Sequence, residues 1–123
     1  MSDSKMIDML LSKGINYFNE KKFYNAHEAW EELWTDYVLK DALFIQGLIQ
    51  LSVAFFHITN FNLRGSNNLF AKCLPKLKKF PSNHRGFNLV EIIDCAERSK
   101  MQVESIKKSN EFNWESVPRI IVS

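Results

Sequence analysis

Apolar residues recur every three or four positions over most of the chain, which is the period of an amphipathic helix. In the first such segment, residues 4–19, one stripe collects Met6, Leu10, Leu11, Gly14, Ile15 and Phe18. The same period predicts further helices over residues 22–36, 41–62, 66–79 and 89–108. Short polar turns separate these segments, so neighbouring helices should pack antiparallel. The pattern therefore predicts an all-α bundle of about five helices, built from antiparallel helix hairpins.

Residues between the helices indicate where some of them begin and end. The Arg64–Gly65 pair is expected to end the third helix, with Asn62 bonding the backbone of the turn. Pro75 should kink or shorten the fourth helix, because proline lacks the backbone N–H that a helix interior needs. Asn88 and Glu91 have the spacing of a capping box and should open the fifth helix.

The third helix, residues 41–62, is apolar on most of its sides and should be the central, buried one. Asp41 precedes its apolar run and is expected to be its N-cap. The first three helices are expected to form the core. The tail, residues 109–123, should be extended, with Trp114 as its anchor and three apolar side chains docked on the helices: Ile120, Ile121 and Val122.

Composition fits one soluble domain. With 123 residues, 46% of them hydrophobic and 24% charged, the chain can bury a core and is not of the disordered class. The expected domain spans 1–123, with its core in 4–108. A net charge of +2 does not point to nucleic acid. The longest apolar run, 48–56, is too short to cross a bilayer.

Two cysteines, Cys73 and Cys95, lie in separate apolar stretches. Without a secretory signal they are expected to be reduced core thiols and not a disulfide. We therefore expect a cytoplasmic location. His84, in the polar stretch SNHRG, is expected to be exposed and without a special role.

Polar, titratable residues interrupt two otherwise apolar segments, AHEAWEELW (26–34) and QGLIQLSVAFFH (46–57). In the first segment, His27, Glu31 and Trp34 share one helical stripe. In the second, Gln50 and His57 share a stripe, and Gln46 lies one turn before Gln50. If these stripes face each other, four polar side chains converge beside Trp34: His27, Glu31, Gln50 and His57.

Four interpretations of this convergence stay open. The first is a buried hydrogen-bond network that fixes helix register. The second is a small-molecule or anion pocket with tryptophan walls, and the third is a metal site with His27, Glu31 and His57 as ligands, although the spacing matches no known helical metal motif. In the fourth, the polar residues are purely structural and the protein is an interaction module. The acidic second helix and the basic segment from Arg64 to Arg85 are the surface features that favour this last interpretation.

Three spaced blocks resemble a known family. They are F-N-x-K-x-F-Y-x-A-H-E-A-W-E-E-L-W (18–34), Q-G-L-I-Q-L (46–51) and H-x-x-x-x-N-x-x-G (57–65). Over roughly residues 7–80 the chain resembles the small helical family called domain of unknown function 309, whose hallmark H-x-x-x-E-x-x-W is here His27, Glu31 and Trp34. The resemblance implies an all-helical fold of about this size and no established activity. Some members occur in plastid lineages, for which a stromal location would replace a cytoplasmic one.

We expect an uncharacterised helical protein with a buried or semi-buried polar site that binds a small ligand or a metal ion. The alternative is a helical-hairpin interaction module. A divalent metal is the one cofactor indicated, and the expected partner is a small molecule or a protein, not nucleic acid or a membrane. No catalytic residue is assigned. The ligand-binding candidates are His27, Glu31, Trp34, Gln46, Gln50 and His57.

Overall fold

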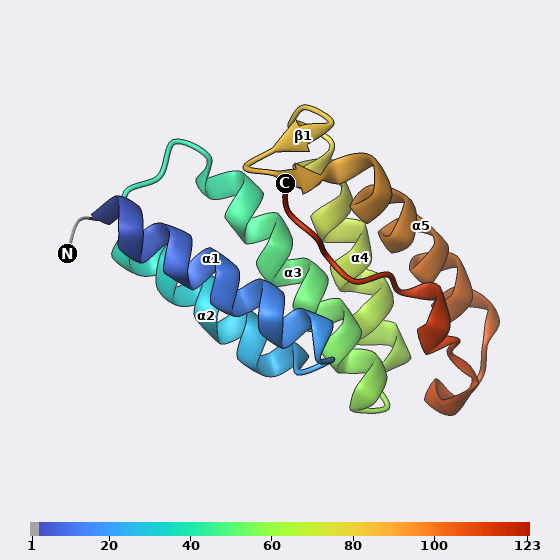
Figure 1. Ribbon diagram of the computed structural model, residues 1–123. Coiled ribbons are helices and arrows are strands. Elements are labelled where there is room, and N and C mark those ends of the chain that lie inside the picture. Colours follow the sequence, from blue (N-terminus) through green and yellow to red (C-terminus); the bar gives the residue numbers. More distant parts are fainter. Residues whose placement is uncertain (1–2) are drawn as a thin grey trace.

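Five α-helices follow one another in a computed structural model that describes residues 3–123 (Figure 1). They are α1 (Asp3–Asn19), α2 (Phe23–Asp36), α3 (Ala42–Thr59), α4 (Leu63–Leu77) and α5 (Leu89–Ser105). Between α4 and α5 two short strands, β1 (Asn83–His84) and β2 (Phe87–Asn88), form an antiparallel hairpin. Two 3₁₀ turns, η1 (Ser109–Glu111) and η2 (Trp114–Ser116), precede the last residues. The all-α prediction is confirmed.

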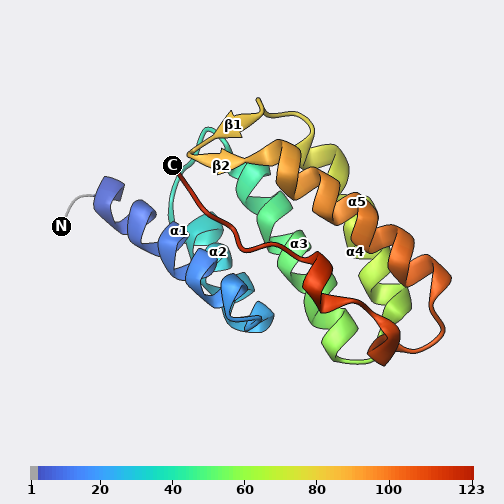
Figure 2. The ribbon, with the colours of Figure 1, turned by 45° about the vertical axis from the view of Figure 1, so that its right-hand side comes forward.

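Helix α3 lies at the centre, as its apolar sequence predicts. It packs against α2 on one side and α4 on the other, while α1 covers α2 and α5 covers α4 (Figures 1 and 2). Within residues 3–123, α3 is the one helix that is long and apolar enough to cross a membrane by length and hydropathy alone. A central core helix has the same properties, and half of α3 is buried inside this fold.

The core runs through all five helices, in agreement with the predicted core span of 4–108, and is not formed by the first three helices alone. Fully or nearly fully buried side chains come from each helix, and α4 and α5 add Phe70, Cys73, Leu77, Ile92 and Ala96. Cys73 and Cys95 are both free and buried, as expected. Burial raises the pKa of the Cys73 thiol to about 12, so Cys73 is an inert core residue.

The break between α3 and α4 falls earlier than predicted. Helix α3 ends at Thr59, and Phe61 takes a left-handed backbone conformation with φ of 59°. Asn62 then caps α4, because its Oδ1 accepts a hydrogen bond of 2.8 Å from the Gly65 backbone N–H. The predicted role of Asn62 is confirmed. Gly65, however, lies in the first turn of α4 and does not end α3.

The last two helices were predicted to contain a proline break and an asparagine cap. Pro75 lies inside α4, which begins at Leu63 instead of residue 66 and ends at Leu77 instead of residue 79. Asn88 caps α5 as predicted, since its side chain accepts a hydrogen bond from the Glu91 N–H.

The polar stretch before α5, for which the sequence predicted no helix or strand, is a two-stranded β-hairpin. Arg85 and Gly86 form its tight turn, with φ values of 50° and 81°. Two consecutive positive φ values are typical of the turn type that matches the twist of a two-stranded hairpin. The hairpin brings His84 and Arg85 back to the N-terminus of α3.

The C-terminal tail crosses α3 between α1 and α5 and ends beside the hairpin (Figures 1 and 2). Trp114 anchors it as predicted, stacking on Phe23 with ring centroids 5.6 Å apart. Ile120 is buried, and both its backbone N–H and C=O bond to the Asn19 side chain at 2.7 and 2.9 Å. Ile121 and Val122 are exposed, which corrects the prediction that they dock.

Candidate functional site

His27 and Glu31 lie one turn apart on α2 and contact each other. His27 Nε2 is 2.9 Å from Glu31 Oε2, and the two side chains are 20% and 52% exposed. The other ring nitrogen of His27, Nδ1, lies 3.0 Å from the Tyr24 carbonyl oxygen. The carbonyl and the carboxylate both only accept, so the neutral ring donates to one of them and only the doubly protonated ring could donate to both. Both ring nitrogens thus contact oxygen atoms of α2 itself, and the pair needs no second helix.

Aromatic side chains flank this pair on the same stripe of α2. Tyr24 and Trp34 are 51% and 41% exposed. Trp30, by contrast, is fully buried and donates its indole N–H to the Leu11 carbonyl oxygen at 3.3 Å. The inward face of α2 is therefore the neighbouring stripe, made of Phe23, Ala26, Trp30 and Leu33.

His57, on α3, is oriented by a different neighbour. Its Nδ1 lies 3.4 Å from the amide nitrogen of Asn62. The Asn62 oxygen is already occupied by the Gly65 N–H, so Asn62 donates its amide hydrogen to His57. In the neutral ring, Nε2 of His57 therefore carries the hydrogen, and it has no hydrogen-bond partner among residues 3–123.

The two glutamines of α3 do not join these histidines. Gln46 and Gln50 are partly buried. The Oε1 atom of Gln50 is buried and has no hydrogen-bond partner within the described chain. Gln46 forms no hydrogen bond there.

The predicted convergence does not form. No hydrogen bond or ion pair among residues 3–123 joins the His27–Glu31 pair to Gln50 or His57. Aromatic rings occupy the contact between the helices, since Tyr24 packs on both His27 and Phe56, with centroids 5.0 and 5.3 Å apart. A fully buried polar network is excluded as well, because Glu31 is half exposed.

The predicted metal set is not assembled either. Within the described residues no three His, Cys, Asp or Glu side chains are grouped closely enough to hold an ion. His27 and Glu31 could supply two ligands, and His57 belongs to a separate contact with Asn62.

Removing either member of the pair should cost little stability. We expect Glu31→Gln to change the free energy of unfolding by less than about 0.5 kcal/mol, since Glu31 is half exposed and makes only an i, i+4 contact. His27→Ala should cost about 1 kcal/mol, because its largely buried ring also contacts the Tyr24 carbonyl and the Tyr24 ring. Trp30→Ala, in the buried stripe, should cost about 3 to 5 kcal/mol. Urea denaturation measures all three. A cost at His27 or Glu31 equal to that at Trp30 would reinstate the structural-network interpretation.

Sequence reasoning missed the strongest electrostatic contact. The Asp41 carboxylate accepts two hydrogen bonds from Arg85, at 2.5 Å from Nε and 2.9 Å from Nη2, and lies 2.8 Å from Nε2 of His84. The Arg85 hydrogen bonds hold the Asp41 pKa at about 2, below its ordinary 3.8. Asp41 was predicted to cap α3. It stands at the N-cap position, but its side chain makes no cap hydrogen bond, because its oxygens bond to the hairpin instead.

His84 is likewise not the exposed residue that was predicted. Its ring packs between Phe44 and Phe80, with centroids 4.7 and 4.9 Å away. We call Asp41, His84 and Arg85 the hairpin latch, since they join the β-hairpin to the start of α3. No local pattern links residue 41 to residue 85, and only the fold brings them together.

The basic segment from Arg64 to Arg85 is partly engaged within the fold. Arg85 belongs to the hairpin latch, Lys78 lies 3.7 Å from Glu97 of α5, and Lys76 donates to the backbone carbonyl of Lys72. This segment therefore does not present a continuous row of free cations.

One family model, described as "Domain of unknown function (DUF309)", matches residues 11–69. Residues 11–69 belong to the DUF309 family. The matched region covers the second half of α1, all of α2 and α3, and the first half of α4, and so includes the His27–Glu31 pair, Trp34 and His57. No curated protein matches the chain. DUF309 membership supports an uncharacterised helical domain and brings no activity with it.

Proposed function

We propose that this DUF309 protein is a binding module and that the exposed face of α2 recognises a basic segment of a protein partner. The observation that carries the proposal is the pair of exposed aromatic side chains, Tyr24 and Trp34, on either side of His27 and Glu31. Large aromatic side chains are enriched where proteins bind one another, because each buries much apolar area at little conformational cost.

The charge of α2 indicates the chemistry of that partner. Between Phe23 and Asp36 the chain has no lysine or arginine. Four exposed acidic side chains lie on this helix: Glu28, Glu31, Glu32 and Asp36. This local field is negative although the whole chain has a net charge of +2, so it favours a positively charged segment at α2 specifically.

Arginine fits both features of this face. A guanidinium group can stack on Tyr24 or Trp34 while it pairs with the carboxylate of Glu28 or Glu31. Apolar residues between the arginines would contact Trp34 and the fully exposed Val38, just beyond the end of α2. The proposed partner segment is therefore basic, with apolar residues interspersed.

A small molecule or a metal ion has less support at this position. His27 and Glu31 supply only two ligands and make their contacts within one helix. The residues that line the cleft described below include none of the six predicted ligand-binding residues.

A short peptide of alternating arginine and leucine is the probe that tests the proposal. In an NMR titration, the amide shifts should cluster on residues 24–38. Trp34→Ala should weaken binding about tenfold or more, because a central aromatic anchor is lost. The double reversal Glu28→Lys/Glu31→Lys should weaken it by a similar factor.

The matched control is Glu97→Lys/Glu104→Lys on α5, which changes the net charge equally but leaves α2 intact. Its affinity should stay close to that of the wild type. A peptide with glutamate in place of arginine should not bind. If both double reversals weaken binding alike, only net charge matters and the α2 proposal fails.

A further inference from the structure

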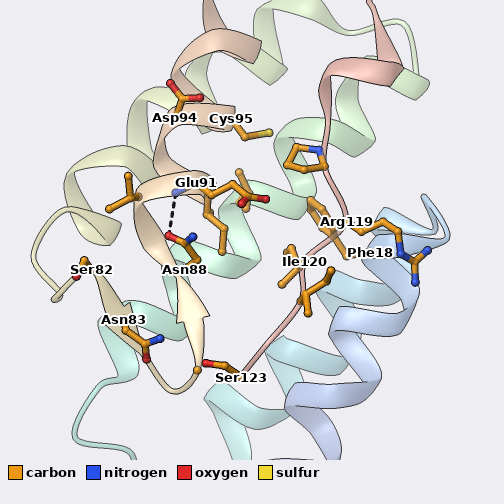
Figure 3. A pocket seen from close by; sticks show the side chains of 16 residues that line it. Phe18, Ser82, Asn83, Asn88, Glu91, Asp94, Cys95, Arg119, Ile120 and Ser123 are labelled. Atoms are coloured by element: carbon orange, nitrogen blue, oxygen red, sulfur yellow. Dashed lines mark hydrogen bonds between the residues drawn. The ribbon is translucent and has the colours of Figure 1, made fainter.

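A cleft of about 900 Å³ lies between the C-terminal tail and the first half of α5, far along the chain from the hallmark motif (Figure 3). Its apolar lining includes Phe18 of α1, Leu51 of α3, Ile92 of α5 and Ile120 of the tail. The hairpin closes one end, where the Ser123 N–H donates to the Gly86 carbonyl oxygen at 3.1 Å. The tail, the hairpin and three helices, α1, α3 and α5, thus meet here, and the volume suits a small organic ligand.

The charged residues of the cleft lining are Glu91, Asp94 and Arg119, and they differ in whether they face the cleft and whether they are already paired. Glu91 extends from α5 over the cleft, whereas the Arg119 guanidinium points away from α5 (Figure 3). Asp94, also on the lining, is already paired with Arg98 at 2.8 Å. The hydrogen bonds and ion pairs of residues 3–123 leave the Glu91 carboxylate without a partner.

We infer that this cleft binds amphipathic organic cations, with an apolar body against the exposed lining residues Val90 and Ile121 and an amine at the Glu91 carboxylate. The apolar lining provides the affinity, since burying apolar surface is favourable and undirected. The unpaired carboxylate provides the choice of head group, because it attracts an ammonium group and repels a carboxylate. This site is separate from the α2 face and does not depend on it.

The tail sets the width of the cleft. Ile120 is held by its own burial and by two hydrogen bonds with the Asn19 side chain, one donated by Asn19 and one accepted by it, so it forms a fixed wall opposite α5. Loosening this wall should weaken the binding of every ligand, whatever its head group. Changing Glu91 should affect only the preference between head groups.

Three probes with the same alkyl chain separate these effects: octylamine, octanol and octanoate. We expect saturable NMR shifts at Ile92 and Ile120, with octylamine binding about three- to tenfold more tightly than octanol and octanoate binding most weakly. Glu91→Gln should bring the affinity for octylamine to that for octanol and leave octanol unchanged.

Two further variants serve as controls. Glu104→Gln removes an acid of α5 outside the cleft and should change none of the three affinities. Asn19→Ala should lower all three alike. The inference is overturned if no probe gives saturable shifts at cleft residues, if the three probes bind equally, or if Glu91→Gln leaves the preference for the amine intact.

Discussion

Replacing Gly14 with alanine is expected to destabilise the protein by about 2 to 4 kcal/mol, although alanine is the better helix former. A Cβ atom at residue 14 would lie 2.1 Å from Nε1 of Trp30 and 2.3 Å from its Cε2. Trp30 is fully buried, so its rigid indole ring has no free space into which it can move.

Three energies determine the size of this effect. Alanine gains about 1 kcal/mol over glycine in a helix interior. Against this, overpacking a core costs about 1 to 3 kcal/mol, and a displaced indole N–H that loses the Leu11 carbonyl adds about 1 to 3 kcal/mol. The unfavourable terms win, and the loss should appear as a lower midpoint in urea denaturation.

A double-mutant cycle ties the effect to the indole ring. In a Trp30→Leu background, which is itself destabilised, Gly14→Ala should cost much less than in the wild type, because the smaller side chain leaves room for the methyl group. An equal cost in both backgrounds would mean that the close approach of α1 to Trp30 does not explain the requirement for glycine.

The contact between Gly14 and Trp30 also shows what the sequence could predict. The period of apolar residues correctly predicted five helices and a central α3, because that period reflects burial directly. On α2, however, the stripe of His27, Glu31 and Trp34 was predicted to face α3. The bulk of Trp30 and the matching gap at Gly14 place the Trp30 stripe inward instead, and this rotation leaves His27 at the edge of the interface and Glu31 half exposed.

Such a rotation cannot be read from one helix alone. It depends on the side chains that meet across the interface, here Tyr24 and Phe56, whose rings occupy the place where a polar cluster was predicted. The hairpin latch was missed for a related reason. The sequence around Asp41 fits a helix cap, but two hydrogen bonds from a distant arginine are stronger than a cap bond to a neutral N–H.

The second large effect concerns that latch. Asp41→Asn is expected to destabilise the protein by about 2 kcal/mol at neutral pH, because it removes a charged, bidentate partner of Arg85. The Asp41 side chain is 11% exposed and those of His84 and Arg85 are 23% and 29% exposed, so solvent screens part of the interaction. The variant leaves a partly buried guanidinium without its carboxylate.

The contribution of Asp41 should depend on pH in a defined direction. Its pKa in the folded protein is about 2, held down first by the Arg85 hydrogen bonds, against an ordinary value of 3.8. A carboxyl group with a lowered pKa stabilises the folded state above its unfolded pKa, and this stabilisation is lost as the pH falls through the folded pKa. The difference between wild type and Asp41→Asn should therefore be constant above about pH 5 and shrink between about pH 4 and pH 2.

Urea denaturation of both proteins at several pH values between about 2 and 7 measures this difference. Asp94→Asn is the matched control, because Asp94 pairs with Arg98 one turn away on the exposed side of α5. A surface pair of this kind should contribute less than about 0.5 kcal/mol at every pH. If the Asp41→Asn difference stays constant down to about pH 2, the carboxylate charge does not hold the hairpin to α3. In that case the packing of His84 and Phe87 on Phe44 would have to hold the hairpin to α3.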